Sequence, residues 1–127
     1  DSLSDKKIAT LWEHPNFRDT SNLPNFAPQT LSIANLGNYD IIGICNSCYD
    51  RTRSRFNFVP NIPNKEQHLD SVWSSDSNGY EFCAYYRKFT ISNDGITFDA
   101  GYSVRPGIRA KSNDYAIPIK IIGIKLI

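Results

Sequence analysis

Apolar and polar residues alternate with a period of two along most of the chain, which is typical of β-strands. The alternation predicts strands over residues 7–12, 29–33, 39–45, 51–59, 79–91, 96–98 and 116–127. Turn-forming residues separate the strands, notably Leu36-Gly37-Asn38 and residues 92–95, where Asn, Asp and Gly tolerate positive φ. Helix chemistry is confined to residues 64–73. We therefore expect an all-β, antiparallel β-sandwich, jelly-roll-like, with at most one short helical turn.

The strand predicted at residues 79–91 changes the parity of its apolar residues partway. Phe82, Ala84 and Tyr86 occupy even positions, whereas Phe89 and Ile91 occupy odd positions. Such a change predicts a bulge or bend, which is common where strands wrap around a sandwich.

The last strand has the clearest apolar pattern. Its alternating isoleucines before Gly123 are Ile117, Ile119 and Ile121, and its later apolar residues are Ile124 and Leu126. The change around Gly123 predicts a bend from one sheet face to the other. Pro118 has no N–H, which predicts a sheet edge or a bulge at that position. Leu126 and Ile127 leave apolar surface at the chain end that a symmetric neighbour could cover. The strand at 39–45 is apolar on both faces, as expected for a central strand.

Composition places the chain among ordinary globular proteins and gives it one domain, residues 1–127. The 127 residues are 40% hydrophobic and 21% charged. A net charge of +1 gives no strong field toward nucleic acid, and no apolar run is long enough to span a bilayer. The absence of methionine suggests the excised C-terminal domain of a longer protein. Three cysteines allow at most one disulfide, which fits assembly in a reducing cytoplasm.

Cys45-x-x-Cys48 has half the spacing of a zinc site, and Cys83, His14 and His68 could complete it. Closed zinc sites usually show a second ligand pair, which is missing here. We therefore expect a buried Cys45, a Cys48 in the following turn and no metal. A Cys45–Cys48 or Cys48–Cys83 disulfide stays open.

Catalytic patterns are weak. No G-x-S-x-G elbow is present, and neither histidine has a recognisable nucleophile beside it. The acids that could pair across a cleft are single and mostly in turns: Asp40, Asp50, Glu81, Asp94 and Asp99. Residues 76–81 are faintly similar to a calcium loop but lack its other ligands. We expect no enzyme and no cofactor.

Two sets of side chains are candidates for binding. Arg51, Arg53 and Arg55 share one strand face and suit an anionic polymer such as teichoic acid, or they keep an exposed face soluble and protect it against edge pairing. The aromatic candidates for packing on a sugar are Trp73, Tyr80, Tyr85, Tyr86 and Tyr102. Tyr85 and Tyr86 are adjacent on a strand, so one points to the core and the other outward.

Short blocks in a fixed order carry a family resemblance. They are Leu11-Trp12, residues 26–31 (Phe-Ala-Pro-Gln-Thr-Leu), Tyr39-Asp40, residues 87–91 and 94–98, and residues 113–124, which end in Ile-Pro-Ile-Lys-Ile-Ile-Gly-Ile. The chain resembles the C-terminal domain of tail-fibre or minor structural proteins from phages and prophages of Gram-positive and gut bacteria. The resemblance implies a distal tail component of the virion, made in the host cytoplasm, commonly trimeric, with no catalytic residues.

Taken together, these observations predict a receptor-binding head domain that recognises a host cell-surface glycan without catalysis. The expected partners are further copies in a homotrimer and a bacterial surface polysaccharide or teichoic acid, with no nucleic acid and no membrane insertion. A purely structural trimerisation module is the first alternative. A polysaccharide-degrading or zinc-dependent enzyme is the second.

Overall fold

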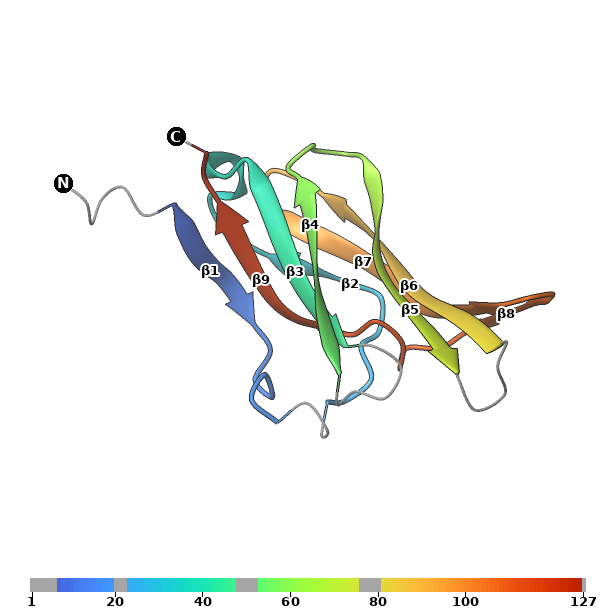
Figure 1. The fold of residues 1–127 in the computed structure, drawn as a ribbon. Coiled ribbons are helices and arrows are strands. Elements are labelled where there is room, and N and C mark those ends of the chain that lie inside the picture. The colour runs from blue at the N-terminus through green and yellow to red at the C-terminus, as the bar shows by residue number, and fades with distance from the viewer. Residues whose placement is uncertain (1–6, 20–22, 48–52, 76–80, 127) are drawn as a thin grey trace.

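The computed structural model describes residues 7–19, 23–47, 53–75 and 81–126. A four-stranded antiparallel sheet has the order β1-β9-β3-β4, and a five-stranded antiparallel sheet has the order β2-β7-β6-β5, with β8 also paired to β7. The strands are β1 (Ile8–Glu13), β2 (Gln29–Ser32), β3 (Ile41–Ser47), β4 (Ser54–Pro60), β5 (Glu66–Ser75), β6 (Glu81–Ile91), β7 (Gly95–Arg105), β8 (Ile108–Lys111) and β9 (Pro118–Ile124). The two sheets pack face to face, which confirms the predicted β-sandwich (Figure 1).

The core lies between the two sheets and is almost entirely apolar. The four-stranded sheet contributes Ile42, Ile44, Ile119 and Ile121, and the five-stranded sheet contributes Leu69, Phe89, Ile91, Ile96 and Phe98. Each of these side chains is at most 1% exposed. Complete burial of such a side chain stabilises the fold by about 1.5–3 kcal/mol, so this layer dominates the packing energy.

The chain wraps around this core. The first and last strands, β1 and β9, are neighbours. Strand β2 lies beside β7 although four strands, β3 to β6, come between them in the sequence. By contrast, β3–β4 and β5–β6–β7 are simple hairpins. The predicted turn at residues 92–95 closes the β6–β7 hairpin, since the Ser92 N–H donates to the Gly95 carbonyl at 2.9 Å.

The helical turn predicted at residues 64–73 is wrong. Nearly all of that segment is strand β5, which pairs with β6 from Glu66↔Thr90 to Ser75↔Glu81. Leu69 is buried and Asp70 exposed, so the segment has the period of a strand. The local helix formers are overridden because β6 supplies a complete ladder of hydrogen bonds. Within the described residues, the helical element is a 3-10 turn, η2 (Leu36–Asn38).

The structure confirms one prediction for the terminal strand and contradicts another. Pro118 was predicted at a sheet edge or a bulge, and it is not at an edge, because β9 runs between β1 and β3. It lies at a bulge, where the pairing shifts from Cys45↔Lys120 to Asn46↔Pro118. The predicted bend at Gly123 is absent, since the pairing with β3 continues through it without a shift. The isoleucines change parity because both faces of this strand are apolar.

Candidate functional site

A β-bulge on β7 interrupts the five-stranded sheet. Phe89 pairs with Phe98 and Arg87 pairs with Gly101, so two residues of β7, Asp99 and Ala100, stand opposite Lys88. The parity argument predicted such an irregularity on β6. Instead, every odd residue of β6 from Cys83 to Ile91 is buried, and the extra residue belongs to β7.

The bulge is held from the core side by a buried arginine. Arg87 is 0% exposed, and its guanidinium donates hydrogen bonds to five main-chain carbonyl oxygens. The acceptors are Ala116 at 3.0 Å, Phe26 at 2.9 Å, Asp99 at 2.6 Å, Asn113 at 3.2 Å and Tyr115 at 2.8 Å. Burial lowers the pKa of Arg87 to about 10, an effect that the nearby Asp99 opposes, so the side chain is a cation at neutral pH. A buried charge needs such complete hydrogen bonding.

The segment between β8 and β9 closes over the bulge on the same side. The carbonyl oxygens of Ser112 and Tyr115 lie where a Cβ on Gly101 would stand, the first at 2.6 Å. Glycine at this position therefore permits the close approach of the two backbones. The same segment carries three of the five carbonyl groups that Arg87 binds, those of Asn113, Tyr115 and Ala116.

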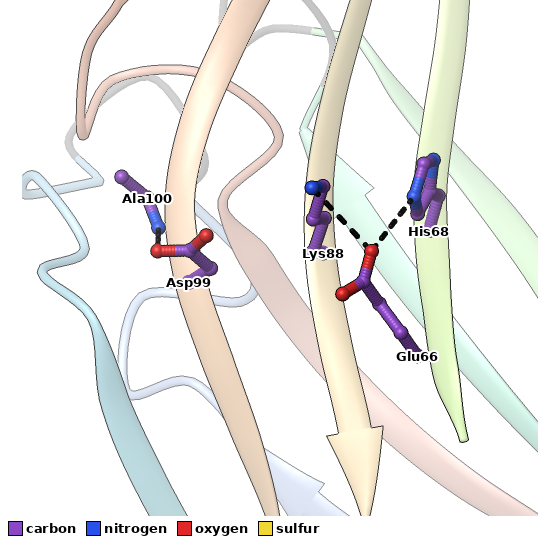
Figure 2. A network of polar contacts seen from close by, with 5 residues as sticks. All are labelled: Glu66, His68, Lys88, Asp99 and Ala100. Carbon is purple, nitrogen blue, oxygen red and sulfur yellow. Dashed lines mark hydrogen bonds and ion pairs between the residues drawn. The ribbon is translucent and has the colours of Figure 1, made fainter.

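On the outer side of the sheet, the bulge borders a cleft of about 380 Å³. Its lining residues come from three strands and the segment before β2: Pro28, Glu66, Lys88, Phe89, Thr90, Thr97, Phe98 and Asp99. Figure 2 shows Glu66 reaching from β5 toward Lys88 on β6, with an Nζ–Oε1 distance of 3.4 Å. His68 lies 3.8 Å from the same carboxylate oxygen. All three side chains are at least one-third exposed, so this is a solvated polar cluster.

Asp99 completes the polar rim of the cleft. One of its carboxylate oxygens accepts the N–H of Ala100 at 2.7 Å, a group that the bulge removes from the ladder (Figure 2). This bond fixes the carboxylate beside the bulge. Thr97 extends the rim toward β2, where its hydroxyl lies 2.8 Å from that of Thr30. The cleft thus presents carboxylate, ammonium and hydroxyl groups on a rigid sheet.

A row of stacked side chains crosses the same face beside the cleft. The ring centroids of His68 and Tyr86 are 5.4 Å apart, and those of Tyr86 and Tyr102 are 5.2 Å apart, with interplanar angles of 18° in both pairs. Arg109 on β8 ends the row, with its Cζ 4.2 Å from the Tyr102 centroid. Neighbours cover the faces of both tyrosine rings, so a ligand meets ring edges and hydroxyl groups. Face-on packing of a sugar was the sequence-based expectation for these two residues.

The structure places the predicted aromatic binding residues in different environments. Tyr86 and Tyr102 come together in the stacked row, whereas Tyr85 is 2% exposed and packs on Tyr115 inside the sandwich. Tyr85 is therefore inaccessible, and its prediction as a ligand contact is wrong. The backbone of Trp73 lies on β5 opposite Cys83. Tyr80 lies outside the described residues.

The arginine stripe belongs to a different part of the molecule. Arg53 precedes β4 and Arg55 lies on it, both exposed at the edge of the four-stranded sheet. Arg51 lies outside the described residues. Arg53 and Arg55 thus lie away from the sheet that carries the stacked row, so they do not form one binding surface with it.

The proposed zinc ligands do not converge. Cys45 on β3 and Cys83 on β6 are buried in opposite sheets, His14 follows β1, and His68 is on β5. Cys48 lies outside the described residues, as do Asp50 and most of the calcium-like loop at 76–81. In the part of the chain that the structure describes, no group of three His, Cys, Asp or Glu side chains could hold a metal ion.

Sequence reasoning named Asp99 only among the single acids, and it missed Arg87, which supports the bulge beside the cleft. Arg87 was overlooked because a charged residue at a core position carries no hydrophobic signal, although its odd number places it in line with Phe89 and Ile91. Asp99 was assigned to the solvated acids. The bulge beside Asp99 has one signal in the spacing: Arg87 lies two positions from Phe89, whereas its partner Gly101 lies three positions from Phe98.

Comparison of the chain with protein-family models, with curated proteins and with solved structures finds no match in any of the three. No helix in the described segments is long and apolar enough to cross a membrane. The functional argument therefore depends on the geometry of the site.

Proposed function

We propose that this chain is a non-catalytic glycan-binding domain whose site is the outer face of the five-stranded sheet at the β7 bulge. The observation that carries the proposal is the cleft in which Asp99, Glu66 and Lys88 stand together beside the tyrosine row. Sugar hydroxyls both donate and accept hydrogen bonds, so they can pair with carboxylate, ammonium and phenol groups within one footprint. The cleft is within the usual size range of ligand sites.

The rigidity of the support favours binding. The cleft lies on three paired strands, and the five hydrogen bonds of Arg87 fix the bulge beneath it. A preformed site loses little conformational entropy when a ligand binds. Its carboxylates already accept bonds from Lys88 and from the Ala100 N–H, an arrangement that suits them as hydrogen-bond acceptors for sugar hydroxyls.

The biological setting follows from the resemblance to phage tail-fibre domains. We propose a virion tail component, made in the host cytoplasm, which presents this face to a polysaccharide of the bacterial surface as part of a homotrimer. A structural tail module that binds no glycan is the second candidate. The observation that favours it is the apolar outer face of the four-stranded sheet, where Phe58 is 57% exposed.

An array of bacterial surface polysaccharides and teichoic acids, followed by calorimetry on the best ligand, tests the proposal. Tyr86→Phe keeps the stack and removes one hydroxyl, and Asp99→Asn removes the charge and keeps an acceptor for the Ala100 N–H. We expect each change to weaken binding about 5- to 30-fold, as for the loss of a hydrogen bond worth about 1–2 kcal/mol. Arg55→Gln, on the other sheet, is the matched control and should leave the affinity unchanged.

Three results would contradict the proposal. The first is the absence of binding to any glycan. The second is binding that Tyr86→Phe and Asp99→Asn leave intact but Arg55→Gln abolishes, which would place an anionic polymer on the arginine stripe. The third is release of shortened saccharides from the bound polymer, which would identify an enzyme.

A further inference from the structure

Much of the outer face of the four-stranded sheet is apolar, although Thr10 of β1 is also exposed there beside Ile122. Register pairs place Ile8 on β1, Ile124 on β9 and Ile41 on β3 in one row. The next row contains Ile122 on β9 and Phe58 on β4, with Gly43 of β3 between them. We call this surface the isoleucine face; it comprises Ile8, Ile41, Phe56, Phe58, Ile122 and Ile124.

The members of the isoleucine face form one continuous surface. Side-chain atoms of both Phe58 and Ile122 lie within 3.0 Å of the position that a Cβ on Gly43 would occupy, so they meet over the glycine. Phe56 and Phe58 are stacked, with centroids 5.5 Å apart and an interplanar angle of 14°. Glycine at position 43 thus lets the two neighbouring side chains close the gap between rows.

The members on the two edge strands are unusually exposed for apolar side chains, whereas Ile41, Ile122 and Ile124 are partly buried. Ile8 is 61% exposed, Phe58 57% and Phe56 40%. The opposite face of the same sheet forms the core, through Ile42, Ile44 and Ile121. A sheet that is apolar on both faces is normally covered on both faces. No element of the described chain covers this side, as Figure 1 shows, with β1, β9, β3 and β4 forming one outer layer.

We infer that a second copy of this chain covers the isoleucine face. The inference deepens the assembly part of the proposed function and is independent of glycan binding. Charge favours self-association, because the six side chains carry none and the net charge of the chain is only +1. At the rim, Lys120 lies 3.8 Å from Glu13, so this pair is internally balanced. Nothing on the face selects a partner of opposite charge, and two copies bring no like charges together.

The size of the isoleucine face also fits a second copy of the chain. The whole outer side of the sheet, with four strands at a spacing of about 4.8 Å and six or seven residues at about 3.3 Å each, has a projected area of roughly 400 Å². Side-chain relief raises the accessible area toward about 600 Å² for each copy, the lower range for a specific interface. Two exposed stacked phenylalanines at its edge supply the aromatic anchors that dominate such contacts.

Sedimentation velocity over a series of about 1 to 100 µM protein tests the inference. We expect the wild-type chain to form a dimer or trimer within this range. Phe58→Asp and, separately, Ile8→Asp should each raise the dissociation constant at least about tenfold, because each buries a charge in the contact. Val72→Asp is the matched control. Val72 is 55% exposed on the outer face of the other sheet, so its variant should assemble as the wild type does.

Circular dichroism verifies that each variant is folded. Ile8→Asp is the safer variant in this respect, because Ile8 is exposed on the edge strand β1 and is not part of the core. A wild-type chain that stays monomeric at the highest concentration would overturn the inference, as would assembly that both substitutions leave unchanged. Titration of monovalent glycan into Phe58→Asp separates the two proposals. Retained affinity in a monomer supports both, whereas an assembled wild type without glycan affinity supports this inference and contradicts the glycan site.

Discussion

Nη1 of Arg87 donates a hydrogen bond of 2.6 Å to the carbonyl oxygen of Asp99. A guanidinium in the core thus binds the backbone of a residue whose side chain lies on the outer face of the sheet. The same guanidinium binds the segments at Phe26 and Tyr115. One side chain therefore joins the bulge, the segment before β2 and the segment before β9. This bond holds the backbone of the bulge next to the cleft, to which Asp99 contributes its side chain.

Arg87→Lys should lower the free energy of unfolding by at least about 3 kcal/mol. A lysine ammonium has three donors and no planar fork, so several of the five buried carbonyl groups lose their partner, at about 1–3 kcal/mol each. Urea unfolding followed by tryptophan fluorescence measures the change. Arg55→Lys on the exposed edge strand is the control and should stay within about 0.5 kcal/mol of wild type. Equal midpoints for Arg87→Lys and wild type would show that the five bonds do not stabilise the fold.

Gly101→Ala should destabilise the protein by about 1–3 kcal/mol, since the added Cβ meets the carbonyl oxygens of Ser112 and Tyr115. The backbone of the crossing segment must move, and the acceptors of Arg87 move with it. Thermal unfolding by calorimetry measures the loss. Gly37→Ala is the control, because no heavy atom lies within 4 Å of its added Cβ. A midpoint for Gly101→Ala equal to that of Gly37→Ala would contradict the close approach.

Stability should fall on acidification because of His14. Its Nδ1 accepts the Asn16 N–H at 3.0 Å, and burial lowers its pKa below the ordinary 6.5. The unfolded chain therefore binds a proton more readily than the folded chain, and stability declines as the pH falls through 6.5. Unfolding midpoints between about pH 7 and 5 measure the decline. His14→Gln should flatten it. Parallel curves for wild type and His14→Gln would exclude this source.

Much of the fold could be predicted from the sequence because its core strands follow strict alternation. Apolar periodicity marks the strands around Ile42, Ile91 and Ile119, and turn-forming residues mark the turn at residues 92–95. Strand β8 was missed because it has only four residues, all exposed, so its short Ile-Arg-Ala-Lys alternation carries little signal. Strand β5 was read as helical because Lys65, Glu66 and Gln67 favour helix locally, and only its pairing with β6 decides otherwise.

The candidate site was less accessible to sequence reasoning. Tyr86 and Tyr102 were identified as aromatic candidates, but their stacking requires the register of β6 against β7. The cleft requires a bulge that depends on Arg87, and these five bonds link segments up to 61 residues apart. Local patterns do not encode contacts of that range. The parity change in the last strand is visible in the sequence, but it reflects a strand that is apolar on both faces and not the predicted bend at Gly123.

The most direct test of the central claim is amide chemical-shift mapping of the isotope-labelled chain during titration with the best glycan from the array. The account predicts that the largest shifts cluster at the bulge and its neighbours, on Lys88, Thr97, Asp99 and Ala100, with smaller shifts along the stacked row. Shifts confined to β3, β4 and β9, or no shifts with any glycan, would contradict it.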